Sequence, residues 1–106
     1  MRIKDLLSQA AELLNLTPDG WNRSIYFDQS KLSEEVGEVA ECLNKSKKTD
    51  EDLAEELSDV ITVCCIIALK KNIDLESAII NKQEKRIRKL LKRYHNGKLP
   101  LIPRWI

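Results

Sequence analysis

The sequence predicts an all-α protein, an antiparallel bundle of four main helices, on three observations. The 106 residues include only three glycines and three prolines, while Leu, Ile, Lys and Glu are abundant, a composition that favours helices over sandwiches and barrels. Apolar residues recur at helical spacing, and the polar breaks between them are short, as they are between antiparallel neighbours. Because a chain of this length is the natural size of one domain, we predict a single domain over residues 1–106.

The first two helices are separated by a recognisable turn. The first helix covers residues 2–14, and the TPDG run at residues 17–20 follows as a turn, because proline presets φ and glycine accepts a positive φ. Residues 1–24 therefore form an N-terminal helix and a connector. The second helix begins within residues 24–30 and ends near Lys45.

The second half of the chain contains two more helices and a tail. The third helix runs from the N-cap Thr49 to about Lys71, and the fourth from Leu75 to about Tyr94. Residues 95–106 contain two prolines and several apolar side chains, so we expect an apolar tail that packs on a subunit.

Charge and cysteine content narrow the class of protein. Ten acids lie within residues 34–59 and seven bases within residues 82–93, although the formal net charge is only +1. Two such halves either hold a polyanion with the help of a metal ion or are solvated helix faces.

Cys42, Cys64 and Cys65 fit no metal spacing or disulfide framework, so we expect buried thiols in a reducing cytosol. The N-terminus is no signal peptide and no apolar run could span a membrane, which predicts a soluble, cytoplasmic protein without a membrane partner.

Two stretches of the chain repeat one pattern. LSEEVGEV at residues 32–39 aligns with LAEELSDV at residues 53–60. At about 100° per residue, each helix carries an apolar core stripe with an acidic pair at i, i+3 on the same edge. The stripes are Leu32, Val36, Val39 and Leu43 on one helix, and Leu53, Leu57, Val60 and Cys64 on the other. The pairs are Glu35 with Glu38, and Glu56 with Asp59. If the helices are antiparallel, these edges meet and four carboxylates converge.

Converging carboxylates need a cation, because partial burial raises the free-energy cost of each charge. Oxygen ligands without a nearby His or Cys favour Mg²⁺ or Mn²⁺ over Zn²⁺. Glu34 and Glu55 lie further towards solvent. Two alternatives stay open: the acids are solvated surface charges, or the repeat is an old helix-hairpin duplication without chemistry.

The two acidic motifs carry the pattern of a known family. EExxE, here Glu34 to Glu38, is followed after 17 residues by ExxD, here Glu56 to Asp59. This arrangement resembles the MazG-like nucleotide pyrophosphohydrolases of the all-α NTP pyrophosphatase superfamily. NKQEKRIR at residues 81–88 looks like the basic NKxExRxR segment of MazG domains, so the resemblance covers about residues 25–90.

The resemblance implies Mg²⁺-dependent hydrolysis of a nucleoside triphosphate, NTP or dNTP, to the monophosphate and pyrophosphate. Mn²⁺ would substitute, and the role would be the removal of surplus or non-standard nucleotides. Residues 25–94 would be the catalytic helices of a MazG-like domain that forms a homodimer or homotetramer. The metal ligands would be Glu35, Glu38, Glu56 and Asp59. Glu34 and Glu38 would be catalytic, with Glu34 orienting or deprotonating the attacking water.

The resemblance also suggests residues that bind the substrate. Lys82 and Arg86 match positions near the phosphates, and they lie one turn apart on a helix. The related dCTP pyrophosphatases carry Asn in place of Arg86 and Tyr in place of Val63, so we do not transfer a dCTP preference. Trp21 is our candidate for stacking on the base, against an alternative role in packing. Lys31 we expect to be an i, i+4 salt-bridge partner of Glu35.

Two other functions compete with the hydrolase. In the first, the protein is a non-enzymatic helical module that binds nucleic acid through residues 82–93, while the acidic helices only assemble the oligomer; we do not expect this partner. In the second, the family fold senses nucleotides without turnover. We rank the second last, because all four ligand positions are intact.

Overall fold

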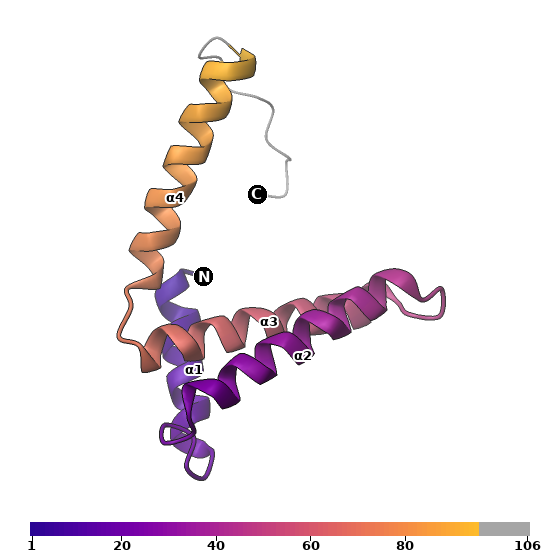
Figure 1. The fold of residues 1–106 in the computed structure, drawn as a ribbon, viewed down its shortest axis with the longest axis vertical. Coiled ribbons are helices and arrows are strands. Elements are labelled where there is room, and N and C mark those ends of the chain that lie inside the picture. The colour runs from indigo at the N-terminus through magenta and orange to yellow at the C-terminus, as the bar shows by residue number, and fades with distance from the viewer. Residues whose placement is uncertain (96–106) are drawn as a thin grey trace. The chain divides into compact units, whose positions relative to one another are not determined.

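The computed structural model describes residues 1–95, which divide into two units, residues 1–74 and the unit that begins at Leu75. Four α-helices follow one another along these residues, and a π-helical turn, Leu91–His95, follows the last of them (Figure 1). The helices are α1 (Ile3–Leu16), α2 (Ile25–Asn44), α3 (Asp50–Lys70) and α4 (Leu75–Leu90). The predicted all-α class and the four helices are therefore confirmed for the described residues. Three expectations stay predictions: a bundle that includes α4, an oligomeric assembly, and a single domain over the whole chain.

Side-chain caps fix where the two central helices begin. The hydroxyl of Ser24 accepts a hydrogen bond from the backbone N–H of Phe27 at 3.2 Å, which starts α2. Thr49 and Asp52 form a reciprocal capping box at the start of α3. Thr49 was the predicted cap, so this part of the prediction is confirmed.

In the first unit, α2 and α3 lie side by side and antiparallel, and α1 crosses α3 (Figure 1). One ion pair ties the first turn of α2 to the last residue of α3. Lys70 Nζ lies 2.8 Å from Asp28 Oδ2, and both side chains are less than a tenth exposed. Lys70 Nζ also donates a hydrogen bond to the carbonyl oxygen of Arg23 at 3.1 Å. These contacts join the open ends of the hairpin and limit sliding of one helix along the other.

The buried core is smaller than the predicted apolar stripes. Its apolar members come from α1 and α3: Ala10, Leu14, Val63, Cys65 and Ala68. The predicted stripes are partly exposed, most clearly at Val36, Leu43, Leu57 and Cys64. The prediction that these stripes form the core of the hairpin was therefore wrong for these positions. The reason is that α2 and α3 turn their acidic edges towards each other, so parts of the apolar stripes face outward.

Two further expectations need correction. Of the three cysteines only Cys65 is buried, while Cys42 is half-buried and Cys64 lies on the outer side of α3. The fourth α-helix ends at Leu90, and the residues up to His95 continue as a π-helical turn instead of an α-helix to Tyr94. The predicted tail beyond residue 95 lies outside the described residues. Among residues 1–95, no helix combines the length and apolar character needed to cross a bilayer.

Candidate metal centre

The four carboxylates that the sequence pairs by repeat come together in space. Each of them offers an oxygen, and these four oxygens lie within 4.8 Å of one another: Glu35 and Glu38 on α2, Glu56 and Asp59 on α3. Within each helix the i, i+3 spacing stacks the two side chains over one turn. Because the helices are antiparallel, the two stacks face each other across the hairpin.

The cluster lies at the edge of the interior. Glu35 is only 8% exposed, Glu38 and Glu56 are half-buried, and Asp59 is exposed. The second oxygen of Glu35 and that of Glu56, Oε2 in each case, is buried and has no hydrogen-bond donor among the described residues. Buried oxygens without donors carry a desolvation cost that a bound cation would remove.

The carboxylates also raise one another's affinity for protons. Burial raises the pKa of Glu35, and a hydrogen bond with Glu38 and the charges of Glu38 and Asp59 raise it further, against a lowering by Lys31. A hydrogen bond with Glu38 and burial raise the pKa of Glu56 to about 7. Carboxyl groups share a hydrogen bond only when one of them holds a proton. The raised pKa values therefore indicate that full ionisation of this cluster, by itself, is unfavourable.

The donor set fits a hard divalent ion. All four donors are carboxylate oxygens, which suit Mg²⁺, Mn²⁺ or Ca²⁺ rather than a soft metal. In an octahedral Mg²⁺ site, opposite ligands are about 4.2 Å apart, twice the Mg–O distance. The observed span of 4.8 Å is therefore close to that of a coordination shell and needs only small side-chain adjustments.

Two charged side chains flank the cluster on its α2 side. Lys31 Nζ lies 3.8 Å from Glu35 Oε1 and 3.6 Å from Glu34 Oε2. The expected i, i+4 pair between Lys31 and Glu35 is thus present. Glu34 is exposed and is not one of the four converging residues.

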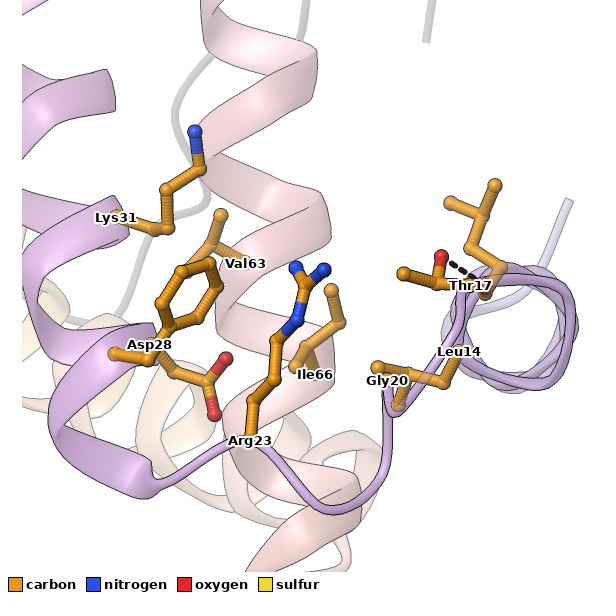
Figure 2. A pocket seen from close by; sticks show the side chains of 10 residues that line it. Leu14, Thr17, Gly20, Arg23, Asp28, Lys31, Val63 and Ile66 are labelled. Carbon is orange, nitrogen blue, oxygen red and sulfur yellow. Dashed lines mark hydrogen bonds between the residues drawn. The ribbon is translucent and has the colours of Figure 1, made fainter.

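A pocket of about 140 Å³ opens between α1, α2 and α3 (Figure 2). Its walls are mainly apolar, and the guanidinium carbon of Arg23 lies 4.8 Å from the centre of the Phe27 ring. Lys31 belongs both to this pocket and to the flank of the cluster. The lining residues are Leu13, Leu14, Thr17, Gly20, Arg23, Phe27, Asp28, Lys31, Val63 and Ile66.

None of the three predicted substrate-binding residues is among the residues that line this pocket. Trp21 is partly exposed, and its Nε1 donates a hydrogen bond to Asn15 Oδ1 at 2.6 Å. Lys82 and Arg86 are exposed on α4, in the second unit, and Arg86 donates to Gln83 Oε1 at 3.2 Å. Base stacking by Trp21 and phosphate binding by Lys82 and Arg86 stay predictions.

Sequence reasoning missed the residues that shape the pocket. Nothing in the sequence ranks Phe27 above Trp21 as an aromatic residue near the site. Asp28 had a signal that was overlooked: it lies two turns before Glu35 and so shares its helix face. A buried acid at that position needs a cation on the neighbouring helix. That cation is Lys70.

The fold and the site define a class: an all-α protein whose helical hairpin carries a carboxylate-only candidate metal centre. Residues 29–93 match the family described as the MazG nucleotide pyrophosphohydrolase domain. The match covers more than half of the chain, so this protein belongs to the MazG nucleotide pyrophosphohydrolase family, as the two acidic motifs predicted. No curated protein and no solved structure matches the chain.

Proposed function

We propose that this protein is a metal-dependent hydrolase that cleaves a nucleoside triphosphate to the monophosphate and pyrophosphate, and so removes unwanted nucleotides. One observation carries the proposal. The four carboxylates converge within 4.8 Å, and two of them have a buried oxygen without a donor among the described residues. Membership of the MazG family supports nucleotide pyrophosphohydrolase activity as the chemistry of this cluster.

Glu35, Glu38, Glu56 and Asp59 would hold the metal, Mg²⁺ in the cell and Mn²⁺ as a substitute. When bound, the ion supplies charge neutralisation for the phosphates and a lowered pKa of nearby water. Glu34, exposed beside the cluster, would orient the attacking water and accept its proton, with Glu38 as the second catalytic carboxylate. The attacking oxygen forms a bond to phosphorus, and the bond to the leaving phosphate oxygen breaks.

Basic residues would bind the rest of the triphosphate. Lys82 and Arg86 are four residues apart on α4, so both can contact one phosphate group. The pocket between α1, α2 and α3 offers apolar walls and the Phe27 ring to the nucleoside, while Trp21 is the second candidate for base stacking. The exposed apolar positions of α2 and α3 support a homodimer or homotetramer, in which a second copy would cover them.

The test is a screen of common and damaged nucleoside triphosphates with Mg²⁺, measuring release of pyrophosphate. We expect turnover of at least one triphosphate and none in EDTA. Replacement of Glu38 by Gln should lower kcat/KM by about 100-fold or more, because the metal centre supplies several kcal/mol of the rate enhancement. The matched control is Glu41→Gln, on the same helix and outside the cluster, which should retain activity.

Two outcomes would reject the proposal. Absence of turnover for every triphosphate would contradict a hydrolase. Salt-dependent binding of DNA or RNA that survives the Glu38→Gln change would instead favour the nucleic-acid-binding module.

A further inference from the structure

Lys31 faces two sites at once. Its ammonium lies against Glu34 and Glu35, and its side chain also lines the pocket between α1, α2 and α3. Figure 2 shows Lys31 beside Val63, with its ammonium group on the side of the pocket away from the Asp28 carboxylate. The residue therefore stands at the boundary between the cluster and the pocket.

The contacts of Lys31 are loose. Both N–O distances, 3.6 Å and 3.8 Å, exceed hydrogen-bond length, and the side chain is 42% exposed. The Asp28–Lys70 pair differs in both respects, at 2.8 Å and almost completely buried. A lysine ammonium on a flexible stem with three donors can exchange such contacts without breaking an ordered network.

A divalent ion would compete with Lys31 for Glu35. Glu35 is one of the four converging ligands, and an ammonium beside a divalent cation is repelled by it. The triphosphate of the proposed substrate would bring new anionic oxygens, which bind an ammonium strongly. Both effects move Lys31 in the same direction, from the carboxylates to the substrate.

We propose that Lys31 changes partners: it pairs with Glu35 while the carboxylates lack a divalent ion, and it binds the triphosphate of the substrate once the ion holds Glu35. The inference rests on the proposed function. It makes Lys31 a substrate-binding residue on the hairpin itself, in addition to Lys82 and Arg86. It predicts effects of opposite sign on metal binding and on phosphate binding, which a static salt bridge does not.

The test compares Lys31→Met with Lys45→Met, because Lys45 makes an exposed i, i+4 pair with Glu41 at the other end of α2. Mn²⁺ binding without nucleotide is measured by calorimetry, and inorganic triphosphate is then titrated in the presence of Mn²⁺. Lys31→Met should bind Mn²⁺ about two- to fivefold more tightly, the size of an exposed charge pair. It should bind inorganic triphosphate about tenfold more weakly, the size of a charged hydrogen bond. Lys45→Met should change neither, and Lys31→Arg should restore triphosphate binding.

The possible failures are distinguishable. If wild-type protein binds Mn²⁺ but Lys31→Met binds it equally or more weakly, the exchange of partners is wrong and the proposed function stands. Unchanged triphosphate affinity in Lys31→Met would also overturn the exchange. If the wild-type protein binds no Mn²⁺, the proposed metal centre itself is wrong, and the role of Lys31 is rejected with it.

Discussion

The buried ion pair between Asp28 and Lys70 should be the most sensitive point of the hairpin. Replacement of Lys70 by Met leaves the Asp28 carboxylate buried without its cation, because apart from Lys70 no donor among the described residues reaches Oδ2 of Asp28. Loss of one partner of a buried pair costs about 3–5 kcal/mol. For a protein of this size each kcal/mol corresponds to about 4–8 °C, so the melting temperature should fall by about 12 °C or more.

Urea unfolding followed by circular dichroism measures this effect. Lys45→Met is the matched control, because the same change removes an exposed pair with Glu41 and should cost less than about 1 kcal/mol. The double variant Asp28→Leu with Lys70→Met should recover most of the stability, since a well-packed apolar pair replaces a buried ion pair at little cost. If Lys70→Met were no more destabilising than Lys45→Met, the argument that burial makes this pair decisive would be refuted.

Two further predictions concern charge and backbone packing. In EDTA, the free energy of unfolding should fall as the pH rises from about 4.5 to about 7. The reason is that the pKa values of Glu35 and Glu56 are raised in the folded state, which therefore binds protons more tightly than the unfolded state. Urea unfolding at a series of pH values measures this fall in stability, and saturating Mg²⁺ should abolish it. A free energy of unfolding that stays constant with pH in EDTA would contradict the prediction. Gly20→Ala should destabilise by about 1–3 kcal/mol, since its Cβ would lie 2.5 Å from the carbonyl oxygen of Leu14. Gly37→Ala has open space on a helix and should stabilise by about 0.5–1 kcal/mol, so similar effects of the two changes in the same assay would contradict the packing argument.

Local signals were sufficient to predict the order of the four helices and the convergence of the four carboxylates. Thr49 was identified because its hydroxyl suits an N-cap, a requirement that does not depend on tertiary structure. The four carboxylates could be paired because a 3.6-residue period fixes which side chains share a face, and the repeat placed both acidic pairs on the same edge.

Burial and the pocket could not be predicted in the same way. The helical period places the apolar stripe and the acidic edge on each helix, but it does not determine which of the two is buried against the partner helix. That choice depends on the rotation of each helix about its axis, which the contacts of α1 with α3 and the Asp28–Lys70 pair help to set. The pocket depends on how α1 crosses the hairpin, so Phe27 and Arg23 gave no signal of their own.

The rotation that exposes the apolar stripes has a consequence for how the protein works. Facing acidic edges oppose folding of the hairpin, because partial burial and mutual repulsion make the ionised carboxylates unfavourable. The same two effects raise the pKa of Glu35 and of Glu56. A ligand that binds only the folded arrangement stabilises it by RT ln(1 + [L]/Kd), about 2.7 kcal/mol at a hundredfold excess over Kd. A cation bound by all four carboxylates would therefore offset this unfavourable contribution. The proposed metal centre would then supply part of the folding free energy of the hairpin when the cation binds.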